Sequence, residues 1–188
     1  VSGPLAIQLA AEAGYEGMQV GEAGGRRMGF PLNDPRVCAA YLESAAARHV
    51  RLHSLNLGAL LAEGAMNYAA GTREGDWARE SLEHGFAAGR ALGVEDVVIT
   101  VDAPDSAAEA NAVEHLRYAQ RLAADSGVVI AMESALPLPD ILRVLDKAGP
   151  EIKVCMDLLN PLRFGAGDPR EQIRAFGRER IRHFHWKD

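Results

Sequence analysis

The pattern of hydrophobic and polar residues alternates along the whole chain between two periods. Segments with apolar or small residues three or four positions apart, such as Leu82, Phe86 and Gly89, are typical of helices that pack one face on a core. Short apolar runs follow them and are typical of buried strands. The runs that we predict as strands are residues 17–20, 51–57, 96–101, 128–133, 152–157 and 181–186.

Start and stop signals separate the predicted helices from these strands. Asp34 precedes Pro35 at the start of one helix, and Ser106 has a glutamate three residues later, the spacing of a capping box. Gly93 and Gly127 follow the last apolar positions of two helices, where a left-handed residue commonly ends a helix. The chain is therefore expected to form six helix-plus-strand units.

This alternation predicts an α/β fold with a parallel sheet and right-handed crossovers, either doubly wound or closed into a barrel. Six units in 188 residues give about 31 residues each, and eight such units would give about 250 residues, the usual size of a (β/α)8 barrel. We expect a single barrel domain over residues 1–188 that is incomplete. Because six strands cannot close such a barrel, we expect these residues alone to have low stability and no activity.

Composition and charge narrow the function classes. The 26 acidic and 20 basic side chains leave a formal net charge of -6, which disfavours general attraction to nucleic acid or to an anionic membrane. Cys38 and Cys155 lack metal-type spacing and are too few for a disulfide scaffold. Charges interrupt the apolar stretches before about 18 residues, and the start lacks a signal-peptide pattern. We expect a cytoplasmic protein that binds a small molecule. The sequence is also compatible with a homo-oligomer.

Three consecutive predicted strands end in a residue that binds metal ions. Glu133 follows the apolar residues 128–132, Asp157 follows a second apolar run, and His185 lies near the end of the last strand. The carboxyl ends of parallel strands meet on one side of a sheet, where functional groups of barrels are found. Two carboxylates and one imidazole suit a divalent ion, namely Mn²⁺, Mg²⁺ or Co²⁺, with Zn²⁺ also compatible.

Five segments carry a resemblance to a known family. In order and spacing, the chain resembles the sugar phosphate isomerase/epimerase family of xylose isomerase-like barrels in AEAGYEGMQV, ALGVEDVVI, VVIAMES, KVCMDLLNPLRFG and HFHWKD. The resemblance implies that Glu133, Asp157 and His185 are three of four metal ligands, from strands five, six and seven. The fourth, a glutamate on strand eight, has no counterpart here, so strands one and eight are expected to lie outside this chain. Gln19 stands where many members have glutamate.

The resemblance also implies a chemistry. Sugar isomerisation or epimerisation removes a proton from carbon, and a divalent ion, with Mn²⁺ expected first, stabilises the enediolate charge. Glu133 is then the acid/base as well as a ligand. Asn160 stands where the family places a substrate-contacting residue, and Lys187 is expected to bind substrate hydroxyls or a phosphate. His53 and Asn56 are expected to contact substrate if their strand places them at the mouth.

Other interpretations stay open. A dehydratase of an inosose or a dehydroshikimate-like acid would use the same fold and form a similar enolate, and a barrel that has lost its metal would bind without catalysis. The related endonucleases would require more inward histidines and a basic groove, which the charge disfavours. His183 is expected to pack in the interior, Phe184 and Trp186 to face helices, and His49, His84 and His115 to lie on the surface.

Overall fold

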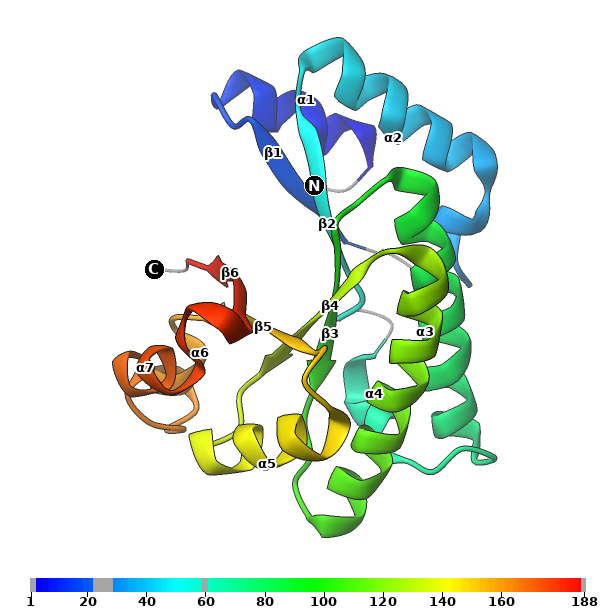
Figure 1. The fold of residues 1–188 in the computed structure, drawn as a ribbon. Helices are drawn as coiled ribbons and strands as arrows, with labels where there is room; N and C mark the ends of the chain where they lie inside the picture. Colours follow the sequence, from blue (N-terminus) through cyan, green and yellow to red (C-terminus); the bar gives the residue numbers. More distant parts are fainter. Residues whose placement is uncertain (1–2, 22–28, 59–60, 187–188) are drawn as a thin grey trace.

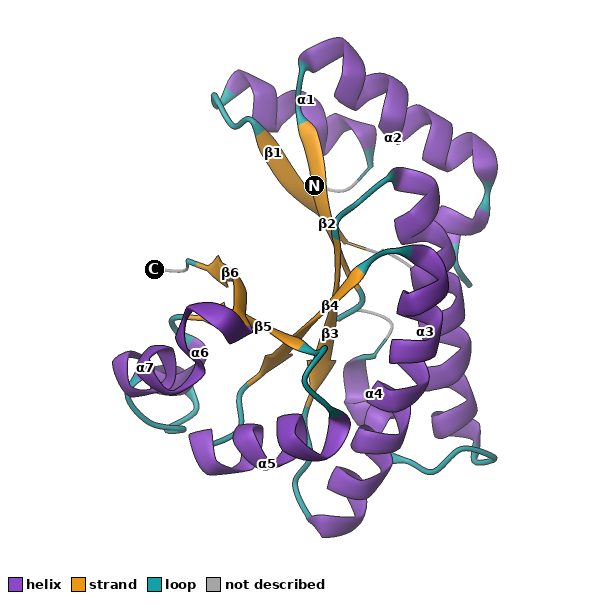
Figure 2. Cartoon of the chain, viewed as in Figure 1, coloured by secondary structure: helices purple, strands orange, loops and turns teal. Residues whose placement is uncertain are grey.

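The computed structural model describes residues 3–21, 29–58 and 61–186, and strands alternate with helices throughout (Figure 2). All neighbouring strands are parallel and follow the sequence order from one edge of the sheet to the other. The strands are β1 (Gly17–Gly21), β2 (Arg51–Asn56), β3 (Asp96–Val101), β4 (Val129–Ser134), β5 (Lys153–Asp157) and β6 (Ile181–His185). Each lies within two residues of its predicted boundaries.

The helices lie along the outer side of the curved sheet, so the chain forms part of a barrel (Figure 1). They are α1 (Pro4–Glu12), α2 (Pro35–Arg48), α3 (Arg73–Leu92), α4 (Ser106–Ser126), α5 (Leu138–Ala148), α6 (Asn160–Arg163) and α7 (Pro169–Arg180). Two 3₁₀ helices, η1 (Pro31–Asn33) and η2 (Ala62–Asn67), lie in connections. The expected α/β fold with an incomplete barrel is confirmed. No helix in the described ranges is long and apolar enough to cross a membrane.

The period of two along the strands divides the core between two faces of the sheet. On β3, Val97 and Ile99 belong to the large core between sheet and helices. Val98 instead forms a small buried cluster with Ala131 and Cys155 on the concave face. Ala131 and Cys155 therefore share the inward face, and the ends of β4 and β5 on that face carry polar residues.

Three local expectations are wrong. Asp105, not Ser106, caps α4, because its carboxylate accepts hydrogen bonds from the backbone N–H groups of Ala107 and Ala108, each at 2.9 Å. His115 is 1% exposed, since its Nε2 lies 2.8 Å from the carbonyl oxygen of Tyr68.

The third correction concerns the last strand. Phe184 and Trp186 are 49% and 83% exposed, although the alternation of side chains places them opposite the inward histidines. In the described part of the chain, β6 is an edge strand of the sheet.

Glu109 forms the ion-pair cluster that joins α4 to α5. Its carboxylate is 6% exposed and accepts hydrogen bonds from Arg143 Nε at 2.7 Å and Lys147 Nζ at 2.6 Å. These two hydrogen bonds lower the pKa of Glu109 to about 2. The negative charge of Glu109 therefore stabilises the folded chain.

We predict that Glu109→Gln lowers the free energy of unfolding at pH 7 by about 1 kcal/mol, a modest value because solvent screens the half-exposed partners. The contribution is fully present above the unfolded-state pKa of about 4.3 and is lost as pH falls toward about 2. Urea denaturation from pH 7 to pH 2.5 should show the stability difference between the two proteins shrinking through this range. Glu114→Gln, which removes an exposed partner of Arg79, is the control, and a difference independent of pH would contradict the prediction.

Candidate metal centre

The ends of β4, β5 and β6 bring two carboxylates and an imidazole together on the concave face. Glu133 is the penultimate residue of β4, and Asp157 and His185 are the last residues of β5 and β6. Asp157 pairs with His185 in the ladder between β5 and β6, while Glu133 pairs with Thr100 of β3. Glu133 and Asp157 are only 8% and 3% exposed. The structure thus places all three predicted ligands at one point.

The ionisable groups of this cluster lie close enough to interact electrostatically. His185 Nδ1 lies 3.2 Å from Glu133 Oε1 and 4.0 Å from Asp157 Oδ2. One ligand atom from each of the three residues lies within 4.8 Å of the others. Burying two carboxylates this close together is costly unless positive charge compensates them. Two carboxylates and one imidazole are a donor set that fits a divalent ion.

A turn after β5 holds the Asp157 carboxylate in place. Its Oδ1 accepts hydrogen bonds from the backbone N–H groups of Leu159 and Asn160, at 2.9 and 2.8 Å. This is the local geometry in which an aspartate side chain organises the turn that follows it. The Asn160 side chain then donates a hydrogen bond to Glu133 Oε1 at 3.4 Å. Asn160 therefore links β5 to β4 at the centre.

A cavity of about 520 Å³ adjoins the centre. Its lining includes Glu133 and Asn160 together with Thr100, the exposed Asp102 and the ring of Phe164. Most groups in this lining are polar or come from strand ends, as is typical of small-molecule sites at the carboxyl face of barrels. The volume lies within the range of pockets that hold small ligands.

The other predicted substrate contacts lie in different places. Asn56 is the last residue of β2, where its amide donates to Gln19 Oε1 at 3.3 Å and its Oδ1 accepts from the Gly58 N–H at 2.6 Å. His53 lies lower in the sheet, next to Asp96 at the start of β3. Lys187 lies outside the described residues.

Asp96 lies at the amino end of β3, away from the carboxyl strand ends where the sequence predicts functional residues. Asp96 is the first residue of β3 and is completely buried, with His53, Arg182 and His183 around its carboxylate. Burial alone would raise the pKa of Asp96, but its interactions with His183 and Arg182 outweigh burial and hold the pKa below its usual value. The signal in the sequence is a charged residue that opens an otherwise apolar run, Asp96–Val101.

We predict that two substitutions of Asp157 separate its role in the turn from its charge. Asp157→Ala removes the acceptor of two backbone N–H groups and should lower the free energy of unfolding by about 1–3 kcal/mol, whereas Asp157→Asn keeps an amide oxygen at that position and should cost less. Chemical denaturation without added metal measures both. Equal losses in the two variants would show that the turn does not depend on Oδ1.

Comparison with protein families agrees with the observed fold. The family model of the xylose isomerase-like TIM barrel matches residues 7–188. Comparison with curated proteins found no match.

Solved structures show the same fold at low sequence identity. The chain is similar to a xylose isomerase domain protein from Planctomyces limnophilus, with a TM-score of 0.79, 15% identity, and coverage of 97% of this chain and 68% of that one. It is similar to a D-allulose 3-epimerase from Methylomonas sp. in complex with D-allulose, with a TM-score of 0.74, 21% identity, and coverage of 97% and 65%. It is also similar to the IOLI protein with a bound zinc atom, with a TM-score of 0.68, 16% identity, and coverage of 98% and 67%.

The family match spans nearly the whole chain, and the parallel strands, outer helices and polar strand ends agree with it. The chain therefore belongs to the xylose isomerase-like TIM barrel family.

Proposed function

We propose that this chain carries the active site of a divalent-metal-dependent isomerase or epimerase that acts on a sugar or a sugar phosphate. The observation that carries the proposal is the convergence of Glu133, Asp157 and His185, with ligand atoms within 4.8 Å of one another beside a cavity of about 520 Å³. Among the similar structures, one is a sugar epimerase bound to its ketose and another holds zinc, which supports both parts of the proposal.

Glu133, Asp157 and His185 are the residues that we propose as metal ligands, and Mn²⁺ is the ion expected first, with Mg²⁺, Co²⁺ and Zn²⁺ as alternatives. A divalent ion held there would polarise the carbonyl and hydroxyl oxygens of a sugar and favour negative charge beside the reacting carbon. The buried position of Glu133 and Asp157 suits this role, because an ion would compensate their charges where water does so poorly.

Glu133 is also the residue that we propose as the acid/base. It lines the cavity, and its Oε1 lies 3.2 Å from His185 Nδ1 and 3.4 Å from the Asn160 amide, so its position is fixed on two sides. A fixed carboxylate at the wall of the cavity can remove a proton from a carbon next to a carbonyl and return it.

Substrate binding is proposed for polar side chains around the same cavity. Asn160 lines it directly, and Asn56 ends β2 on the same carboxyl side of the parallel sheet. Lys187, which follows the last described residue, is proposed from the sequence as a ligand of hydroxyls or phosphate. His53 is not kept in this set, because its observed neighbours are Glu95, Asp96 and His183 rather than residues of the cavity.

We predict that a closed barrel containing this chain exchanges a carbon-bound proton of a ketose with solvent when Mn²⁺ is present, whereas residues 1–188 alone are expected to be inactive. Incubation with free and phosphorylated ketoses in D₂O, followed by NMR, detects deuterium on the carbon next to the carbonyl. Glu133→Gln should slow this exchange by about 10²-fold or more, because it removes the proposed base. Loss of water from the substrate in place of exchange would identify a dehydratase.

Glu80→Gln is the matched control, since Glu80 lies exposed on α3, and this variant should exchange at the wild-type rate. His185→Ala should bind less metal by elemental analysis than His84→Ala, which removes an imidazole from α3. An unchanged metal content in His185→Ala, or an exchange rate that is equal in wild type and Glu133→Gln, would contradict the proposal.

A further inference from the structure

A second cluster of potential metal ligands lies deeper in the concave face of the sheet. His53 of β2, Asp96 of β3 and His183 of β6 each offer one ligand atom within 4.8 Å of the others. Asp96 begins β3, whereas the strand partner of Glu133 is Thr100, four residues further along, which is about 13 Å in an extended strand. The cluster is therefore separate from the candidate metal centre.

Irregular strand pairing brings His53 of this cluster, and the neighbouring Arg182, to the carboxylate of Asp96. Between β1 and β2 the register moves from Leu52 to Ser54, so His53 is an extra residue. Between β5 and β6 the register moves from Ile181 to His183, so Arg182 is an extra residue there. Bulges of this kind re-aim side chains and break the simple alternation of faces. Both extra residues reach the carboxylate of Asp96.

The distances around Asp96 fit a bound ion. His183 Nδ1 lies 3.4 Å from Asp96 Oδ2, and His53 Nδ1 lies 3.7 Å from the same oxygen. In a tetrahedral site with bonds of about 2.0–2.1 Å, ligand atoms are about 3.3 Å apart. Asp96 is completely buried, and among the described residues neither its Oδ2 nor the ring nitrogens of His183 have a hydrogen-bond partner. These atoms therefore lie close together without forming hydrogen bonds to one another.

The surrounding residues form the outer shell that a metal site requires. Arg182 Nε donates to Asp96 Oδ1 at 2.5 Å, which fixes the carboxylate and directs Oδ2 at the two imidazoles. The same guanidinium donates to Glu95 at 2.8 Å, and Glu95 Oε2 lies 3.9 Å from His53 Nε2. A carboxylate behind the second nitrogen of a histidine ligand is a recurrent arrangement in metal sites.

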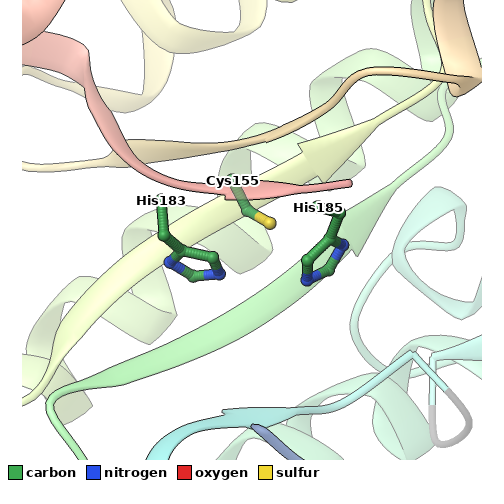
Figure 3. Close-up of side chains that lie close together, drawn as sticks. All are labelled: Cys155, His183 and His185. Carbon is green, nitrogen blue, oxygen red and sulfur yellow. The ribbon is translucent and has the colours of Figure 1, made fainter. Parts of the chain in front are cut away.

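We propose that His53, Asp96 and His183 form a second divalent transition-metal site, separate from the Glu133 centre and suited to Zn²⁺. Two nitrogens and one oxygen match zinc better than the oxygen-rich donors that Mg²⁺ prefers. An ion there would join β2, β3 and β6 across the concave face, so it would stabilise the folded chain. Figure 3 shows one histidine of each site, His183 and His185, on one side of β6 with the Cys155 thiol between them.

Zinc stoichiometry in a variant that lacks the first centre tests this proposal. The double variant Glu133→Gln/Asp157→Asn should retain about one equivalent of Zn²⁺ after dialysis and elemental analysis, while the wild type holds about two. Adding His53→Gln should abolish that equivalent, whereas adding His84→Gln, on the outer helix α3, should keep it. Circular dichroism verifies that each variant is folded. A double variant without zinc, or zinc that survives His53→Gln, would overturn the proposal.

X-ray absorption spectroscopy of Zn²⁺ in the double variant gives an answer that needs no further substitution. The expected first shell contains two imidazole nitrogens, and a shell of oxygen atoms alone would overturn the proposal. Zinc stoichiometry can also refute either site without refuting the other. A single wild-type equivalent that the double variant loses would leave the Glu133 centre standing and refute the second site. A single equivalent that the double variant keeps and His53→Gln removes would do the reverse.

Discussion

Three carboxylates buried on the concave face of the sheet determine how the polar interior of this chain is organised. Asp96, Glu133 and Asp157 are at most 8% exposed, and a buried carboxylate is stable only with hydrogen bonds or positive charge beside it. Each is fixed by a donor from its own surroundings: an arginine for Asp96, an amide for Glu133 and two backbone N–H groups for Asp157. Histidines stand beside all three carboxylates.

The parallel strand order explains why these groups meet. Because β4, β5 and β6 are neighbours, residues at their carboxyl ends share one side of the barrel, and alternation then directs Glu133, Asp157 and His185 inward. Asp96 lies on β3, four residues before Thr100, which is the strand partner of Glu133. At that level of the sheet Asp96 faces His183 of β6. Curvature is what allows a residue of β3 to contact one of β6, since two strands separate them in the sheet.

The period of the apolar residues predicts the six strands and their parallel arrangement. Charged residues after apolar runs were enough to predict Glu133, Asp157 and His185 as neighbours. The position of His53 was beyond such reasoning, because a bulge changes which face a residue takes and leaves no signal in the alternation. The burial of His115 depends on a carbonyl group of Tyr68, which is 47 residues away in the sequence.

The sequence predicts that a capping residue starts α4, but it does not identify which residue that is. Asp105 and Ser106 are both good helix caps, and the glutamate three residues after Ser106 favours Ser106. In the structure Asp105 is the cap, and Glu109 pairs with Arg143 and Lys147 of the next helix. The sequence does not show this contact between helices, because its partners lie more than 30 residues further along the chain.

The central claim is that Glu133, Asp157 and His185 hold one divalent ion. Anomalous X-ray diffraction from crystals of the protein grown with Mn²⁺ tests it most directly, because the signal locates the ion itself. If the three residues bind the ion together, a manganese peak will lie within bonding distance of all three side chains. A crystal whose manganese peaks lie elsewhere, with these side chains contacting only one another, would contradict it.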